Sequence, residues 1–342
     1  MDSRQLSKKT ALSKLRSHQY APHELWENIQ KRDKVALGKA ITLIESTLPE
    51  HRILAEELLN LCMQKASSSL RIGITGVPGV GKSTFINAYT QQLLAEGHKV
   101  AILAVDPSSQ QTGGSILGDK TRMEDIFAHP DVLIRPSPAG ETLGGVAGKT
   151  RETILLCEAA GFDRILVETV GVGQSETAVH KMTDIFLLLM LPGAGDELQG
   201  IKRGIMELAD ILIVHKSDGS NVEKSRTATA DYKRALHLFP PTQSGWIPRV
   251  LSASSLENKG IPEIHEAIEA YYRHTVTNGY FQKNRQNQLR AWFQTALEQQ
   301  FYWMLRHRTD LQELYEKLLE DVNTGRLTPI AAAQQIMSRI FR

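Results

Sequence analysis

The residues best suited to chemistry in this sequence form a glycine-rich run that ends in a lysine and a serine. The run fits the phosphate-loop pattern G-x-x-x-x-G-K-[ST] at every position. A short apolar segment precedes it at residues 70–75, and an expected helix follows at residues 83–95, which is the context such a loop requires. The loop and the threonine after it are Gly76, Val77, Pro78, Gly79, Val80, Gly81, Lys82, Ser83 and Thr84.

This loop predicts a site for nucleotide phosphates. Glycines let the backbone wrap closely, so that amide N–H groups and the start of the following helix face the negative charge. We expect Lys82 to reach the β- and γ-phosphates, Ser83 to ligate Mg²⁺, and Thr84 to contribute an amide or hydroxyl near the α-phosphate. The alternative is a glycine turn beside a lysine that binds nothing, which the matching strand and helix disfavour.

Acidic residues follow neighbouring expected strands, where a magnesium ion on the phosphates would need oxygen ligands. Glu168 ends the segment 164–168, and Asp106 closes the segment that begins at residue 100. For both we favour a role on or beside the metal. Asp119, after a glycine-rich stretch, fits a loop cap and a metal contact equally well. Gly171 is placed to offer its amide to the γ-phosphate and so to sense hydrolysis.

A second motif concerns the base. Val214-His215-Lys216-Ser217-Asp218 resembles the guanine-specifying pattern N-K-x-D, with histidine in place of asparagine. The Asp218 carboxylate can accept from guanine N1–H and the 2-amino group, donors that adenine lacks on that edge. The aliphatic part of Lys216 would cover the base. His215 can donate one hydrogen bond but cannot copy an amide, so the strictness of guanine selection stays open here, as does a charged loop without a ligand.

A third segment completes the expected base site. Ser254, Ser255 and Leu256 follow the last expected strand, in the position of the S-A-[KL] loop whose amides contact guanine O6. Serine at the alanine position is a second departure from the usual pattern. Together the two segments predict GTP or GDP as the ligand.

These loops belong to a chain of ordinary globular composition. It has 342 residues, 41% apolar and 23% charged, which excludes a wholly disordered chain and a collagen-like fibre. A net charge of +2 gives no support to a nucleic-acid or acidic-lipid partner. Two distant cysteines exclude a disulfide framework and disfavour a structural zinc site. Since no run approaches the roughly 20 apolar residues that span a bilayer, we expect no membrane segment.

The amino-terminal residues are basic and lack an apolar signal core. We interpret them as the solvated leader of a cytoplasmic protein. The alternative is a transit peptide, which would direct the chain to the mitochondrial matrix. The charged residues concerned are Arg4, Lys8, Lys9, Lys14 and Arg16, against Asp2 alone.

Three zones organise the chain. Residues 1–68 form a helical extension, residues 69–278 alternate short apolar runs with amphipathic segments, and residues 279–342 are helical again. The short runs are rich in Ile, Val and Leu without polar alternation, as in strands buried on both faces. We therefore predict an α/β nucleotide domain with a mostly parallel sheet flanked by helices. The expected strands are residues 70–75, 100–106, 132–135, 164–168, 185–191, 211–215 and 249–253.

The carboxy-terminal zone carries apolar stripes at helical spacing, which begin at Leu289 and Leu311. Thr328 and Pro329 fit the N-cap and first position of a further helix. Because these faces lie beyond the nucleotide domain, they need a partner, which is either that domain or a second copy of the chain.

Long segments of the chain resemble the MeaB/ArgK family of P-loop GTPases, to which the human methylmalonic-aciduria type A protein is related. The similarity runs from about residue 30 to the carboxy terminus and is weakest at both ends. The matching segments are residues 76–84, 104–109, 112–123, 167–176 and 198–204.

The resemblance implies a GTPase that chaperones an adenosylcobalamin-dependent acyl-CoA mutase, usually methylmalonyl-CoA mutase, by gating cofactor delivery and protecting the mutase. It also implies a homodimer formed through the helical carboxy-terminal arm. By the same resemblance, Asp106, Asp119 and Glu168 are the metal-linked acids. Residues 193–202 correspond to a mobile switch, in which Lys202 swings toward the nucleotide when the partner is bound.

The expected reaction is in-line attack of water on the γ-phosphate, with Lys82 and Mg²⁺ offsetting the developing charge. Gln174 is a candidate for positioning that water and fits a hydrogen bond within the switch equally well. We expect slow intrinsic hydrolysis that the partner accelerates, with Lys202 supplying positive charge. Three alternatives stay open: a P-loop kinase, a nucleotide-sensing scaffold, and a nickel-inserting GTPase, which the scattered histidines and the lack of Cys-x-x-Cys disfavour.

Overall fold

The structure is a computed structural model that describes residues 21–65, 68–105, 124–136, 143–169, 175–193 and 203–340. The chain divides into two compact units, one that ends at Arg285 and one that begins at Gln286.

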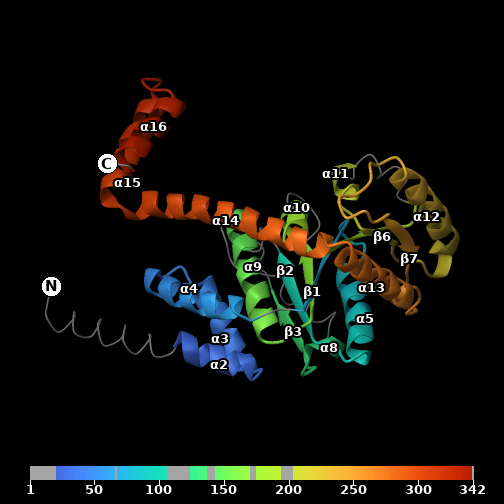
Figure 1. Ribbon diagram of the computed structural model, residues 1–342. Coiled ribbons are helices and arrows are strands. Elements are labelled where there is room, and N and C mark those ends of the chain that lie inside the picture. The colour runs from blue at the N-terminus through green and yellow to red at the C-terminus, as the bar shows by residue number, and fades with distance from the viewer. Residues whose placement is uncertain are drawn as a thin grey trace. The chain divides into compact units, whose positions relative to one another are not determined.

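The first unit is built around a seven-stranded sheet in which all paired strands run parallel (Figure 1). The order is β3-β2-β4-β1-β5-β6-β7. This confirms the predicted fold class, and each strand begins where its apolar run begins. The strands are β1 (Leu70–Gly76), β2 (Val100–Val105), β3 (Val132–Arg135), β4 (Arg164–Thr169), β5 (Ile185–Met190), β6 (Ile211–Val214) and β7 (Arg249–Ser252).

Burial explains why the apolar runs form these strands. Every residue of β5 and of β6 is buried, so both faces of the central strands pack against helices. A polar side chain on either face would lose its contact with water, which is why these strands lack the alternation of a half-exposed sheet.

The strand order changes direction at β1. Strands β2, β3 and β4 lie on one side of β1, and β5, β6 and β7 lie on the other. In open parallel sheets a crevice forms at such a point, outside the carboxyl ends of the strands, and ligands bind there. We refer to this side as the carboxyl end of the sheet and to the opposite side as its amino end.

Helices cover both faces of the sheet (Figure 1). One face packs against α9 (Leu143–Ala159), on which the described amino-terminal helices rest, and the other packs against α5 (Lys82–Ala95) and α13 (Ile261–Thr277). The helices of this unit are α2 (Pro22–Gln30), α3 (Lys34–Glu45), α4 (Pro49–Met63), α5 (Lys82–Ala95), α8 (Glu124–Phe127), α9 (Leu143–Ala159), α10 (Ser175–His180), α11 (Arg203–Met206), α12 (Val222–Leu236) and α13 (Ile261–Thr277), with the 3₁₀ turn η2 (Gly219–Asn221).

The second unit is helical. It comprises most of α14 (Tyr280–His307), which begins in the first unit, together with α15 (Thr309–Asn323) and α16 (Pro329–Ile340), which pack against each other. The Thr328 hydroxyl accepts a hydrogen bond from the Ala331 amide at 3.3 Å, which confirms the predicted helix start. Within the described residues, no helix combines the length and apolar content that crossing a bilayer requires.

Candidate nucleotide site

The phosphate loop leaves β1 at the centre of the sheet. Gly76 is the last residue of that strand, and α5 begins at Lys82. A Cβ atom at Gly76 would lie 2.5 Å from the carbonyl oxygen of Leu189 on β5. Only glycine therefore lets β1 and β5 run side by side up to the point where the loop begins.

The first turn of α5 carries the polar residues of the loop. Lys82 is 9% exposed, and its Nζ donates to the Gly76 carbonyl oxygen at 3.2 Å, so the side chain lies across the loop. Ser83 and Thr84 are half-buried beside it. The backbone at Gly81 is left-handed, with φ +92°, and this conformation brings the loop into the start of the helix. The loop thus has the strand, turn and helix that its sequence predicts.

The base loop meets the phosphate loop through His215, which directly follows β6 and is 2% exposed. Its Nδ1 lies 2.7 Å from the Val80 carbonyl oxygen, and its Nε2 lies 2.7 Å from Ser255 Oγ. The ring also meets Phe85 edge-on. Burial lowers the pKa of His215, and the positive charge of Lys216 acts in the same direction.

Two further contacts connect the base loop to its surroundings. Lys216 Nζ donates to the Gly79 carbonyl oxygen at 2.7 Å, which places the lysine stem across the phosphate loop. Ser254 Oγ donates to Asp218 Oδ2 at 2.5 Å, which orients the carboxylate. Leu256, the next predicted residue, is 81% exposed. The structure therefore brings residues 76–84, 215–218 and 254–256 together at the carboxyl end of the sheet.

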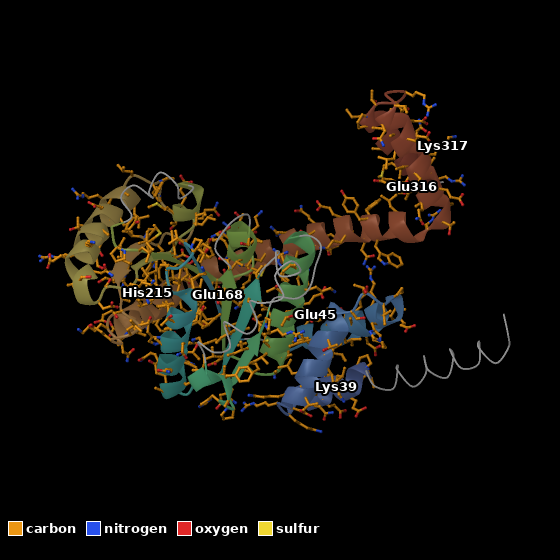
Figure 2. The ribbon with its side chains drawn as sticks, turned by 180° about the vertical axis from the view of Figure 1, so that it is seen from behind. Lys39, Glu45, Glu168, His215, Glu316 and Lys317 are labelled. Carbon is orange, nitrogen blue, oxygen red and sulfur yellow. The ribbon has the colours of Figure 1, made fainter. Side chains whose placement is uncertain are left out.

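Glu168 reaches the same end of the sheet from β4, where it pairs in register with Ile74 of β1. Figure 2 labels Glu168 and His215. One residue further along, the hydroxyl groups of Thr75 and Thr169 lie 2.7 Å apart. The described residues contain no cluster of three or more His, Cys, Asp or Glu side chains arranged for a metal. Ser83 and Glu168 offer oxygen atoms, the donor type that suits Mg²⁺.

Several predicted residues cannot be placed. Asp106, Asp119, Gly171, Gln174 and Lys202 lie outside the described residues, and so does most of the predicted switch. Sequence reasoning also missed one feature of the described site, namely the contacts of His215 with Val80 and Ser255. The sequence did offer one sign of these contacts, because His215 and Ser255 both depart from the usual pattern of the same site.

Comparison with known proteins assigns the family. A family model described as "Methylmalonyl Co-A mutase-associated GTPase MeaB" matches residues 37–310. The chain belongs to the MeaB family. Members of this family are P-loop GTPases, and the described loops agree with guanine-nucleotide binding and GTP hydrolysis as the activity of this chain.

Curated relatives and a solved structure agree with the MeaB assignment. GTPase ArgK of Escherichia coli is 44% identical over 308 residues, which is 90% of this chain and 93% of that protein. The mouse protein named "Methylmalonic aciduria type A homolog, mitochondrial" is 40% identical and covers 92% of this chain and 78% of its own length. The crystal structure titled "LAO/AO transport system kinase" aligns with a TM-score of 0.71 at 36% identity, covering 94% of this chain and 98% of that one.

Proposed function

We propose that this MeaB-family GTPase chaperones an adenosylcobalamin-dependent acyl-CoA mutase, most simply methylmalonyl-CoA mutase, and that its GTP cycle gates loading of the cobalamin cofactor. The observation that carries the GTPase half is the meeting of phosphate loop and base loop through His215 and Lys216. The mutase half rests on the description of the matching family model and on the name of the mouse relative.

In this proposal the phosphate loop binds the nucleotide mainly through its backbone. The amides around Gly79 and Gly81 face the phosphates, and the Lys82 ammonium moves from the Gly76 carbonyl to the γ-phosphate when GTP enters. Asp218, oriented by Ser254, accepts from guanine N1–H and the 2-amino group. Water attacks the γ-phosphate in line with the leaving oxygen.

Magnesium is part of the proposal. Ser83 and Glu168 are the described residues that would hold the ion, with Asp106 and Asp119 as its further carboxylates. When bound, Mg²⁺ neutralises charge that develops on the phosphate oxygens. We assign Gln174 to the attacking water, Gly171 to sensing of the γ-phosphate and Lys202 to added positive charge in the partner-bound state.

The test is phosphate release from GTP and from ATP, with and without a purified adenosylcobalamin-dependent methylmalonyl-CoA mutase. Slow GTP turnover that the mutase accelerates, with ATP inert, is the expected result. Lys202→Ala should keep the basal rate and lose the acceleration. Turnover that the mutase does not change would reject this client. Hydrolysis of ATP at a similar rate would reject guanine selection.

A cofactor-loading assay separates a GTP-driven chaperone from a nucleotide-sensing scaffold. Lys82→Ala removes the phosphate contact, whereas Gln174→Ala is expected to retain GTP and slow its hydrolysis. If both variants fail to support loading of the mutase, turnover is required. If only Lys82→Ala fails, nucleotide binding suffices and the chain acts as a nucleotide-sensing scaffold. Because the two cysteines are free and buried, we place this activity in the reducing cytoplasm.

We further propose a homodimer that forms through the second unit. Its helices expose large apolar side chains that soluble monomers usually cover. We predict that the double replacement Phe293→Asp and Leu297→Asp converts the dimer to a monomer in sedimentation velocity, while Gln294→Glu on the same helix leaves it dimeric. A wild-type monomer at micromolar concentration would contradict the proposal. The exposed residues are Leu289, Phe293, Leu297, Phe301, Tyr302, Trp303, Tyr315, Leu319, Ile330 and Met337.

A further inference from the structure

Two residues that depart from the usual guanine-site pattern contact each other. His215 replaces the usual asparagine, and Ser255 replaces the usual alanine. They are 40 positions apart in the chain, yet His215 Nε2 lies 2.7 Å from Ser255 Oγ. Both positions belong to the base site, so their proximity is expected, but the 2.7 Å contact shows that the two replacing side chains bond to each other.

The geometry fixes which atom carries each proton. The Val80 carbonyl oxygen, 2.7 Å from Nδ1, can only accept a hydrogen bond, so Nδ1 must carry the ring proton. Because burial lowers the pKa of His215, the ring is neutral at pH 7. Nε2 then holds a lone pair, which accepts a hydrogen bond from the Ser255 hydroxyl group. Both ring nitrogens are therefore occupied by groups of the protein.

Packing holds the ring in this orientation. A Cβ atom at Gly81 would lie 3.0 Å from His215 Nδ1 and Cε1, so the imidazole fills the space beside the loop backbone. Phe85 meets the ring edge-on, with centroids 6.0 Å apart. A turn of the imidazole toward a ligand would break two short hydrogen bonds of a side chain whose residue is 2% exposed.

We propose that His215 and Ser255 form one coupled positioning unit, which joins the base loop to the phosphate loop and donates no hydrogen bond to the base. The proposal rests on the proposed guanine-nucleotide site. Asparagine has two amide N–H groups, so one can reach the Val80 carbonyl and the other remains for the N7 acceptor of guanine. Neutral histidine has one N–H group, and that group is on Val80. Base selection then falls to Asp218.

The same arrangement explains why the serine is needed. With alanine at position 255, the Nε2 lone pair would be buried without a donor, and an unmatched buried polar atom weakens the state that contains it. With asparagine at position 215, there is no ring nitrogen to which the serine hydroxyl can donate a hydrogen bond. The two positions should therefore be energetically coupled, which a double-mutant cycle measures directly.

The first experiment is that cycle, read as GTP affinity by calorimetry on the full chain. Ser255→Ala should weaken GTP binding about tenfold, because it strands Nε2. The double variant His215→Asn with Ser255→Ala should bind within about threefold of the wild type. Thr229→Val, which removes a hydroxyl from α12, should change nothing and is the matched control. Single effects that simply multiply in the double variant would overturn the coupling.

The second experiment uses 7-deaza-GTP, which has carbon in place of the N7 acceptor. The wild type should bind it within about twofold of GTP. The double variant, with an amide at position 215, should bind it about fivefold more weakly than GTP, which is the effect of one hydrogen bond. If the wild type lost as much affinity for 7-deaza-GTP, relative to GTP, as the double variant does, His215 would donate to the base and the proposal would be wrong.

The outcomes separate this proposal from the proposed function. If the wild type fails to bind GTP at all, the guanine site itself is wrong. If it binds GTP and the cycle shows no coupling, the site is right and the positioning role is wrong. Circular dichroism and thermal unfolding of each variant show whether a lost affinity reflects a misfolded chain.

Discussion

Different kinds of polar contact connect the loops at the two ends of the central sheet. At the carboxyl end, the Lys82 and Lys216 ammonium groups and the His215 ring contact backbone carbonyl oxygens of the phosphate loop. At the amino end, buried carboxylates pair with arginines and accept hydrogen bonds from the backbone. Both ends belong to the same parallel strands, so the difference reflects the task of each end and not the sheet itself.

At the amino end, the same kind of hydrogen bond from a backbone N–H to an aspartate occurs at three strands. An aspartate directly precedes each of β4, β5 and β6, and its carboxylate accepts a hydrogen bond from a backbone N–H in the neighbouring strand or directly before it. Asp163 accepts from Lys99 at 2.7 Å, Asp184 from Arg71 at 2.8 Å, and Asp210 from Phe186 at 2.9 Å. These contacts satisfy backbone donors where the sheet hydrogen bonding stops.

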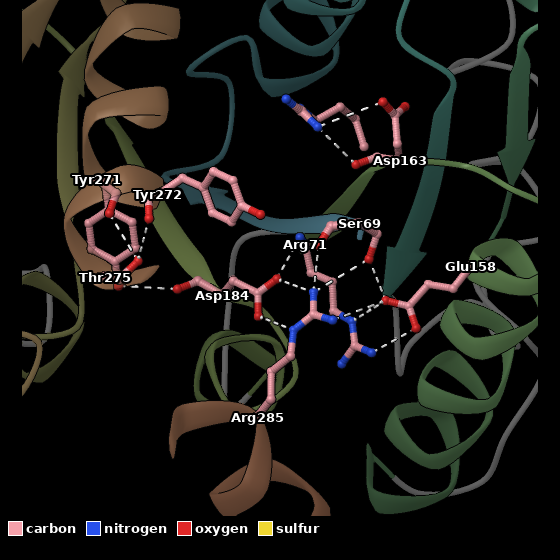
Figure 3. A network of polar contacts seen from close by, with 10 residues as sticks. Ser69, Arg71, Glu158, Asp163, Asp184, Tyr271, Tyr272, Thr275 and Arg285 are labelled. Atoms are coloured by element: carbon pink, nitrogen blue, oxygen red, sulfur yellow. Dashed lines mark hydrogen bonds and ion pairs between the residues drawn. The ribbon is translucent and has the colours of Figure 1, made fainter. Parts of the chain in front are cut away.

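Arginines complete this end of the sheet (Figure 3). Arg285, in the first turns of α14, donates to both oxygens of Asp184 at 2.9 and 2.7 Å. Arg71 donates to both oxygens of Glu158 at 2.8 and 2.9 Å. Burial alone would raise the pKa of Glu158, but Arg71, Arg285 and Ser69 outweigh it and lower that pKa. Every charge in this network has a partner.

The two ends of the sheet should differ in how readily their contacts rearrange. Loss of one partner from a buried ion pair strongly destabilises a protein, so we expect the contacts at the amino end to persist when a ligand binds. A hydrogen bond from a side chain to a backbone carbonyl can be exchanged for a contact with a ligand at a lower cost in free energy than a buried ion pair can. We therefore expect nucleotide binding to exchange contacts at the carboxyl end and to leave the ion pairs at the amino end unchanged.

The largest effect should come from the carboxyl end. Lys82→Ala should lower GTP turnover by roughly 10²–10³-fold, because an ammonium group no longer offsets charge in the transition state. It should change the free energy of unfolding by about 1 kcal/mol, since the buried side chain gives up its hydrogen bond to the Gly76 carbonyl oxygen. Phosphate release and urea unfolding measure the two quantities. Full turnover in this variant would remove Lys82 from the mechanism.

The opposite pattern should follow from Arg285→Ala at the amino end. The change leaves the buried carboxylate of Asp184 without its charged partner and should lower the free energy of unfolding by about 3 kcal/mol. The folded variant should bind GTP as the wild type does. Arg234→Ala removes an exposed pair with Asp231 and should change stability by less than about 1 kcal/mol. Equal effects of the two replacements would refute the contrast between the two ends.

A smaller effect should appear as a pH dependence. Burial raises the pKa of Asp210 from 3.8 to about 7. Between these values the folded state holds a proton that the unfolded state has lost, so the free energy of unfolding should fall as pH rises, by about 1.4 kcal/mol per pH unit from this group. Asp210→Asn should flatten that slope, as shown by urea unfolding from pH 5 to 8. The exposed control Asp231→Asn should keep the wild-type slope.

Much of this architecture could be predicted from sequence because its determinants are local. Continuous apolar runs mark strands that are buried on both faces, and the phosphate loop is a contiguous motif with its strand and helix beside it. The aspartates at the amino end were not recognised, since an acidic residue before a strand looks like any loop residue. The pairing of Arg285 with Asp184 spans 101 positions and leaves no local pattern.

In the base site, too, the sequence could not reveal a contact between residues that lie far apart in the chain. The sequence identified Asp218, His215 and Ser255 as members of the site and identified the last two as departures from the usual pattern. It could not show that they contact each other, because the register of β6 against β7 brings their loops together. Each residue looked like a separate weakening of guanine selection, and the structure shows one joint arrangement.

The histidine–serine contact also has an evolutionary consequence. Asparagine and histidine differ by one nucleotide, as do alanine and serine, so a lineage can acquire the pair in two steps. If histidine came first, the intermediate would carry a stranded ring nitrogen, whereas serine beside asparagine only adds a small hydroxyl group. Descent should therefore have passed through the serine form. Relatives with serine and asparagine at these positions should be common, and relatives with histidine and alanine should be rare, a distribution that an alignment of the family would confirm or refute.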